Sequence, residues 1–169
     1  MDRPPLVVVM GVSGSGKTSV GSRIAKLLGV VFVDGDSLHS SANVAKMAAG
    51  IPLTDDDRWP WLGQVGQVLA DANQSGLVVA CSALKRSYRD EIRRHAPTAL
   101  FVHLAGSREI LQSRVERRQK HFMPATLLDS QLETLELLQT DEAGFQVEIG
   151  QPISKIANQV VALLSQRTL

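Results

Sequence analysis

A glycine-rich stretch near the amino terminus limits the possible folds more than any other feature of the sequence. The pattern G-x-x-x-x-G-K-[ST] is met at each fixed position by Gly11, Val12, Ser13, Gly14, Ser15, Gly16, Lys17 and Thr18. Glycines in such a turn let backbone N–H groups surround phosphate oxygens, and a following helix points its positive end at the same anion. The stretch therefore predicts a nucleotide-binding loop in which Lys17 neutralises the β and γ phosphates and Thr18 ligates Mg2+.

The rest of the chain alternates between strand-like and helix-like segments. Short β-rich runs bounded by breakers occur at residues 6–10, 30–33, 77–81, 99–104 and 146–149, with helical apolar spacing between them. Gly29 is placed to end the first helix, Ser107 to cap a later one, and Thr126 with Asp129 to form a capping box. This alternation predicts a single α/β domain, residues 1–169, with a parallel sheet covered by helices on both faces.

Composition excludes several classes of partner. The 169 residues are 44% hydrophobic and 21% charged, which is typical of one compact soluble domain. A formal net charge of +1 gives no basic surplus for binding nucleic acid, and the longest apolar run is too short to span a membrane. Cys81 is the only cysteine, and the amino terminus lacks the pattern of a signal peptide. We therefore expect a cytoplasmic protein with neither a nucleic-acid nor a membrane partner.

The phosphate loop indicates a nucleotide but leaves the acceptor open, because motors, GTPases, ATPases and small-molecule kinases share it. The chain has no N-K-x-D run of the kind that reads guanine, and the strand at residues 77–81 lacks the terminal Asp-Glu of many ATPases. A chain of 169 residues leaves little room for further domains. A small-molecule kinase is therefore the leading class.

Two carboxylates follow the second strand at Asp34 and Asp36. Parallel strands of an open sheet bind ligands at their carboxyl ends, so both side chains are expected beside the phosphate loop. One carboxylate, Asp34, is predicted to help hold Mg2+ together with Thr18. The other, Asp36, is predicted to accept the proton of an attacking hydroxyl or to orient that hydroxyl.

Several runs beyond the loop carry a family resemblance. They are Gly35-Asp36-Ser37-Leu38-His39, Asn43, Lys46-Met47, Gly50-Ile51-Pro52-Leu53, residues 55–62 (Asp-Asp-Asp-Arg-Trp-Pro-Trp-Leu), residues 81–90 (beginning Cys-Ser-Ala-Leu-Lys), His121-Phe122-Met123-Pro124 and residues 127–136. In this order, from Gly11 to about Pro152, the chain resembles gluconate kinases of the small P-loop type, which are relatives of shikimate kinase.

The resemblance implies ATP-dependent phosphorylation of D-gluconate to 6-phospho-D-gluconate. It also implies a P-loop kinase fold of the nucleoside-monophosphate-kinase type, a three-layer α/β/α architecture whose five-stranded parallel sheet has the order 2-3-1-4-5. An acceptor-binding helical segment is expected at residues 37–74 and a lid at residues 119–125. The cofactor is expected to be Mg2+, and a homodimer is favoured.

The same resemblance implies roles for individual side chains. Gluconate is a polyhydroxylated carboxylate, so its site needs cations and mixed hydrogen-bonding groups. The candidate substrate-binding residues are Asp36, His39, Asn43, Arg58, Lys85, Arg86 and His121. Arg114 and Arg118 hold the family positions of lid arginines that stabilise the transferring phosphoryl group. Gln151 and Pro152 lie in the loop expected to contact adenine.

Two positions depart from the family pattern. Ser40 stands where relatives have proline after the histidine, and Lys120 stands where they have glycine before the lid histidine. The first departure is expected to alter the loop rather than the chemistry, whereas Lys120 removes backbone freedom and adds charge. A kinase for shikimate or another sugar acid, and a nucleotide-dependent regulatory switch without turnover, remain alternatives at this point.

Overall fold

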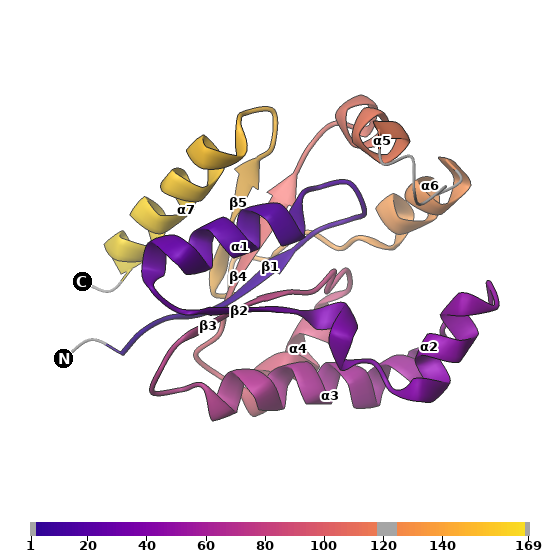
Figure 1. Ribbon diagram of the computed structural model, residues 1–169, viewed down its shortest axis with the longest axis horizontal. Coiled ribbons are helices and arrows are strands. Elements are labelled where there is room, and N and C mark those ends of the chain that lie inside the picture. Colours follow the sequence, from indigo (N-terminus) through magenta and orange to yellow (C-terminus); the bar gives the residue numbers. More distant parts are fainter. Residues whose placement is uncertain (1–2, 118–124, 168–169) are drawn as a thin grey trace.

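The computed structural model describes residues 3–117 and 125–167 (Figure 1). Its centre is one parallel sheet in the order β2-β3-β1-β4-β5. The strands are β1 (Leu6–Met10), β2 (Val31–Asp34), β3 (Leu77–Ala80), β4 (Leu100–Ala105) and β5 (Gly144–Glu148). The predicted parallel sheet and its order are therefore confirmed. The last strand begins two residues before the predicted start, because Gly144 already pairs with Phe101 of β4.

Helices cover both faces of the sheet, as the alternation of segments predicts. On one side lie α1 (Lys17–Leu28) and α7 (Ile153–Arg167), and on the other lie α3 (Asp55–Asp71) and α4 (Arg86–His95) (Figure 1). Successive residues of the central strand β1 alternate between these layers. Val7 and Val9 join the core beneath α1 and α7, whereas Val8 and Met10 join the core beneath α3 and α4. The fold is thus the expected three-layer α/β/α arrangement.

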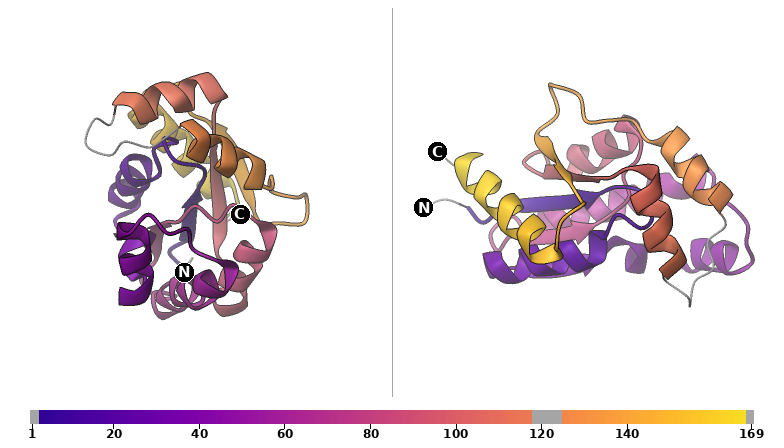
Figure 2. Two further views of the ribbon diagram at one scale, coloured as in Figure 1. Left: turned by 90° about the vertical axis from the view of Figure 1, so that its right-hand side faces the viewer. Right: turned by 90° about the horizontal axis from the view of Figure 1, so that it is seen from above.

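The remaining helices gather at the carboxyl ends of the strands. They are the short 3-10 helix η1 (Gly35–Leu38), α2 (Ser41–Ala48), α5 (Arg108–Arg117) and α6 (Ala125–Thr134). Seen from this end, α5 and α6 lie above the sheet and α2 lies below it (Figure 2, left). The two chain ends lie on the opposite side of the molecule (Figure 1). The elements that follow the strands therefore surround the edge at which open parallel sheets bind ligands.

Local signals at the helix ends are partly confirmed. Gly29 ends α1 with a φ of 69°, and the Ser107 hydroxyl accepts a hydrogen bond from the Ile110 N–H at 3.3 Å. The predicted capping box at Thr126 is wrong, because α6 already begins at Ala125. Asp129 instead accepts two hydrogen bonds from Arg108, at 2.6 and 3.1 Å, and so links α6 to α5.

A capping box that the sequence analysis missed begins α3. The Thr54 hydroxyl accepts from the Asp57 N–H at 3.2 Å, and the Asp57 carboxylate accepts from the Thr54 N–H at 2.9 Å. Lys46 of α2 donates to the same carboxylate at 2.8 Å. Hydrogen bonds from Lys46 and Thr54 lower the pKa of Asp57 to about 2. The start of α3 is thereby fixed against α2.

None of the helices in the described part of the chain has the length and apolar character needed to cross a bilayer.

Candidate active site

The phosphate loop turns sharply between β1 and α1, and its conformation depends on glycine. Gly14 has a φ of 84°, and a Cβ atom there would lie 2.9 Å from Val115 Cγ2 and 3.0 Å from the Leu111 carbonyl oxygen. Gly16, with a φ of 89°, stands at the N-cap of α1 and contributes no side-chain cap. The N-terminus of α1 is consequently open to an anion.

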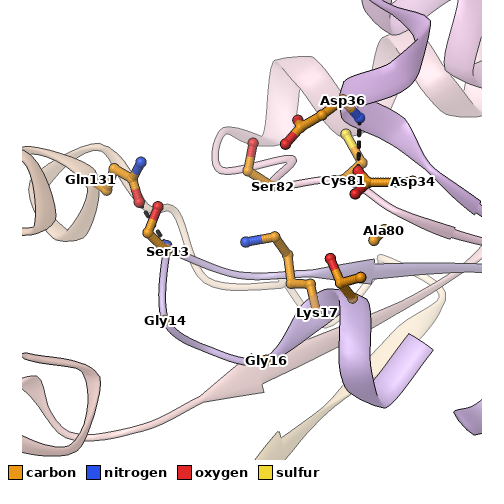
Figure 3. Close-up of a pocket in the computed structure, with 11 residues that line it drawn as sticks. Ser13, Gly14, Gly16, Lys17, Asp34, Asp36, Ala80, Cys81, Ser82 and Gln131 are labelled. Carbon is orange, nitrogen blue, oxygen red and sulfur yellow. Dashed lines mark hydrogen bonds between the residues drawn. The ribbon is translucent and has the colours of Figure 1, made fainter. Parts of the chain in front are cut away.

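A cavity of about 230 Å3 lies between this loop and the carboxyl ends of β2 and β3 (Figure 3). Lys17 and Thr18 contribute to one side of it, and Asp34 and Asp36 to the other. The full lining is Ser13, Gly14, Gly16, Lys17, Thr18, Asp34, Asp36, Ala80, Cys81, Ser82 and Gln131. The Lys17 ammonium donates to the Val12 carbonyl at 3.1 Å. The fold therefore brings the predicted phosphate loop and both predicted carboxylates to one cavity.

The two carboxylates owe their position to close packing around Gly35. A Cβ atom on Gly35 would lie 2.5 Å from the Ala80 carbonyl oxygen at the end of β3, so only glycine allows this approach. The Trp61 indole N–H of α3 donates to the Gly35 carbonyl at 2.8 Å. Asp34 accepts from the Asp36 N–H at 3.0 Å and caps η1. The backbone between the carboxylates is thus held from both sides.

The residues around the cavity fit a Mg2+ ion that arrives with a nucleotide. Such an ion takes one or two protein oxygens and completes its shell with phosphate and water. The Thr18 hydroxyl and the Asp34 carboxylate are hard oxygen donors that line the same cavity. In residues 3–117 and 125–167, no group of three or more His, Cys, Asp or Glu side chains could hold a metal ion. The donor set suits a nucleotide-borne metal.

His39 and Asn43 are held by contacts with α3, and neither lines the phosphate-loop cavity. The His39 ring stacks on Trp61 at 4.1 Å between centroids, and the Asn43 side-chain amide nitrogen donates to the Asp57 carbonyl at 2.9 Å. Asn43 also lies 3.3 Å from the His39 ring nitrogen Nδ1. Burial lowers the pKa of His39 despite the opposing charge of Asp36. The lowered pKa favours the neutral ring, which can both donate and accept hydrogen bonds.

The serine that departs from the family pattern has a structural role. The Ser40 hydroxyl accepts from the Asn43 N–H at 3.1 Å and caps α2. Serine is one of the best N-cap residues, so the start of α2, with Asn43 in its first turn, does not need the proline of relatives. Lys120, the second departure, lies outside the described residues.

Arg58 and Lys85 meet at one carboxylate, that of Asp55. The Arg58 guanidinium lies 3.1 Å from an Asp55 oxygen and the Lys85 ammonium 3.7 Å from the other. The Tyr88 hydroxyl donates to Asp55, and its ring lies under both cations at 5.5 to 5.8 Å. The Tyr88 hydrogen bond, reinforced by the two cations, lowers the pKa of Asp55, while burial and this hydrogen bond raise that of Tyr88 to about 12. The structure thus brings two of the predicted carboxylate-binding cations together.

Arg86 does not share this cluster. Its guanidinium makes two hydrogen bonds with the Asp141 carboxylate, at 2.6 and 2.9 Å, and a third with the Gln139 side chain at 2.7 Å. These contacts turn Arg86 toward the segment before β5, and Arg86 does not line the phosphate-loop cavity. These contacts tie the start of α4 to the segment before β5.

A second hollow, of about 520 Å3, lies between α5 and the loop after β5. Gln151 and Pro152, expected near adenine, line it together with Arg114. Arg114 donates to the Ile149 carbonyl at 2.6 Å, and its guanidinium lies 3.5 Å from the Cβ position of Gly16. One predicted lid arginine, Arg114, therefore lies beside the phosphate loop and shares this hollow with the predicted base loop. Arg118, His121 and residues 119–124 of the predicted lid lie outside the described residues.

Four lining residues had no site role assigned from sequence, and two of them, Ser82 after β3 and Gln131 on α6, bring a hydroxyl and a carboxamide to the cavity. Both belong to runs that carry the family resemblance, but their chemistry is visible only in the fold. Gln131 accepts a hydrogen bond from the Ser13 N–H through its side-chain oxygen at 2.7 Å. No spacing rule could join residues 118 positions apart.

Comparison with known proteins agrees with this geometry. The model of the shikimate kinase family matches residues 13–163. The thermosensitive gluconokinase of Escherichia coli is 45% identical over 156 residues, which cover 90% of this chain and 83% of that protein. A gluconokinase structure from Sinorhizobium meliloti superposes with a TM-score of 0.89 at 49% identity, covering 99% of this chain and 95% of that one.

A shikimate kinase from Acinetobacter baumannii gives a useful contrast. It superposes with a TM-score of 0.65 over 98% of this chain and 96% of its own, but at 19% identity, so it shares the fold alone. The gluconokinases share, in addition, nearly half of their residues with this sequence over most of its length. The chain accordingly belongs to the gluconokinase family, a branch of the shikimate kinase family of P-loop kinases.

Proposed function

We propose that the chain transfers the γ-phosphoryl group of ATP to D-gluconate and releases 6-phospho-D-gluconate. One observation carries this proposal beyond family membership. A single cavity joins Lys17 of the phosphate loop to Asp36 at the end of β2, so a phosphate donor and a hydroxyl acceptor can meet between them (Figure 3). Phosphoryl transfer depends mostly on such positioning and on charge stabilisation.

The phosphate side binds and stabilises charge. Backbone N–H groups of residues 11–18 surround the phosphates, and the Lys17 ammonium neutralises charge on the terminal ones. Thr18 and Asp34 would hold Mg2+, which would supply further positive charge to the nucleotide phosphates. Arg114, beside Gly16, and Arg118, by its family position, stabilise the transferring group and exclude water.

The acceptor side binds a sugar acid. Asp36 accepts a hydrogen bond from the attacking hydroxyl and orients it more than it deprotonates it, because the transition state of phosphoryl transfer is loose. His39 and Asn43 contact the hydroxyls, and His121 is included by family position. Arg58 and Lys85 bind the carboxylate, which takes over part of the role that Asp55 has in this structure. Arg86 is omitted because its donors are engaged by Asp141 and Gln139.

Three further features belong to this proposal. The acceptor-binding role of residues 37–74 and a homodimer rest on the family, and a cytoplasmic location rests on the composition of the sequence. Light scattering on the purified protein measures the oligomeric state directly.

A coupled assay with ATP, Mg2+ and a panel of D-gluconate, D-glucose and shikimate tests the proposal. We expect gluconate to be the preferred acceptor. Equal turnover of shikimate or glucose would make the acceptor assignment wrong while leaving the phosphate loop intact. Nucleotide binding without turnover of any acceptor would favour a regulatory switch instead.

A further inference from the structure

We propose that Gln131 is a catalytic residue whose side-chain amide nitrogen, Nε2, donates hydrogen bonds to the phosphoryl group while it is being transferred. The proposal deepens the proposed kinase function, since it concerns the same cavity. It assigns a task to an α6 residue that the phosphate-loop pattern does not include. Four observations lead to it.

The first is position. Gln131 lines the cavity that also contains Lys17 and Asp36, and it reaches there from α6, on the side away from β2 (Figure 3). Its Oε1 atom lies 2.7 Å from the Ser13 backbone nitrogen and accepts that N–H. The carboxamide therefore touches the phosphate loop itself.

The second is the chemistry of an amide. A carboxamide carries an acceptor oxygen and a donor NH2 group in one plane, so a hydrogen bond that holds the oxygen in place also sets the position of the NH2 group. Here Ser13 occupies the oxygen, and among the described residues the Nε2 atom has no acceptor. Two N–H donors at the wall of a phosphate cavity match the oxygens of a phosphoryl group. Glutamate could accept from Ser13 equally well but would present negative charge to the phosphate.

The third is which phosphate lies within reach. The Lys17 ammonium bonds to the Val12 carbonyl, so the Val12–Ser13 corner is the end of the loop where terminal phosphate charge is neutralised. Gln151 and Pro152, expected near the base, line a different hollow, between α5 and the loop after β5. Asp36 lies across the cavity from Ser13 (Figure 3). The Nε2 atom of Gln131 thus lies at the end of the site where the terminal phosphate is expected.

The fourth is rigidity, which catalysis by positioning requires. The segment after α6 is tied to the start of α4, because the Glu136 N–H donates to the Leu84 carbonyl at 2.8 Å. The Glu136 carboxylate in turn accepts from the Arg86 N–H at 2.9 Å. Leu128, one turn before Gln131, is fully buried in the core. These contacts hold Gln131 at a fixed distance from both the nucleotide loop and α4.

The test compares Gln131→Glu with Gln166→Glu, the same change at an exposed position on α7. Calorimetry measures the Kd of Mg2+-ADP and of a non-hydrolysable Mg2+-ATP analogue, and steady-state kinetics measure kcat. For Gln131→Glu we expect a Kd for the ATP analogue at least about tenfold higher and a kcat about a hundredfold lower. We expect ADP binding to change less than about twofold and Gln166→Glu to match the parent.

The ADP measurement separates a catalytic from a structural role. If Gln131 only shapes the loop, ADP and the ATP analogue weaken together, and the proposal is overturned. A kcat within about threefold of the parent overturns it as well. Should Gln131→Glu fail to fold, Gln131→Met, which removes the donors without adding charge, decides by the same ADP-to-analogue contrast. Because the binding readout contains no gluconate, it stands or fails independently of the acceptor.

Discussion

The two sides of the cavity are built by different means. The phosphate side is built mainly on one contiguous stretch, residues 11–18, in which glycine shapes the backbone and backbone groups do much of the binding. The acceptor side comes from η1, α2, α3 and α4, whose side chains hold one another in place. Trp61 secures Gly35, and Asp55 gathers Arg58 and Lys85. A site formed by backbone groups can therefore be recognised from a sequence pattern, whereas a site formed by side chains depends on tertiary contacts that the pattern does not show.

Two neighbouring cations on the acceptor side make the same point. Lys85 and Arg86 are adjacent at the start of α4 and look equivalent in the sequence. Lys85 lies over the Tyr88 ring beside Asp55, while Arg86 is bound by Asp141. Successive side chains on a helix point in different directions, so adjacency does not imply a shared task.

The largest expected effect is on the phosphate side, in Lys17→Ala. Removing this cation takes away charge stabilisation in the transition state, and we expect kcat/KM to fall by about a hundred- to a thousandfold. The loop is held by its backbone, so the thermal unfolding midpoint should stay within a few degrees of the parent value. Steady-state kinetics and circular dichroism measure the two effects.

Lys26→Ala is the matched control, because Lys26 is an exposed residue in the last turn of the same helix. It should retain parental kinetics. Near-normal gluconate phosphorylation by Lys17→Ala would contradict the phosphate-loop mechanism.

The next effect separates the two carboxylates at the boundary between the sides. Asp36→Asn keeps size and polarity but loses the charged acceptor, and we expect kcat to fall by about a hundredfold with little change in ATP binding. Asp34→Asn should instead raise the Mg2+ concentration needed for half-maximal rate. Titrations of rate against Mg2+ distinguish them. If Asp34→Asn lowered kcat severely while Asp36→Asn lowered it only slightly, the two roles would be the reverse of those assigned here.

The sequence predicts the parallel sheet, the phosphate loop and the carboxylates after β2, because each depends on local pattern and on topology. The order of the strands is predicted from the family resemblance. The capping box at Thr126 fails because α6 starts one residue earlier and Asp129 finds Arg108 instead. Arg86 and Gln131 could not be placed either. Their partners, Asp141 and Ser13, lie 55 and 118 residues away, and only tertiary packing decides such pairs.

A smaller effect tests the contrast between Lys85 and Arg86. Lys85→Met removes a charged hydrogen-bond donor to the gluconate carboxylate and should lower kcat/KM for gluconate by about tenfold or more. The parent should prefer gluconate to glucose by at least about a hundredfold, and this variant should erode the preference. Arg86→Met should keep the preference and lower only the unfolding midpoint. An equal loss of preference for gluconate in both variants would mean that Arg86 also contributes to substrate binding.

The smallest effect on activity, and the clearest on stability, concerns the anchor of α4. Glu142 is buried and accepts from Arg89 at 2.8 Å, from the Gln139 N–H at 2.8 Å and from Arg93 at 2.7 Å. Burial alone would raise its pKa, but these hydrogen bonds lower it to about 2. A carboxylate whose pKa is lower in the folded state stabilises the fold above its unfolded pKa, and that stability is lost as the pH falls toward 2.

Glu142→Gln tests this anchor by leaving Arg89 buried without its counter-charge. We expect the free energy of unfolding at pH 7 to drop by about 3 kcal/mol, with Glu116→Gln, an exposed residue of α5, as the control. Urea unfolding between pH 7 and pH 2.5 should show the parent losing stability below about pH 4.5 more steeply than Glu142→Gln, because the variant has no carboxylate there to protonate. Parallel pH profiles would mean that Glu142 is not the group that titrates. If kcat/KM for gluconate fell as sharply in Glu142→Gln as in Lys85→Met, α4 would belong to the chemistry of the acceptor side and not only to its support.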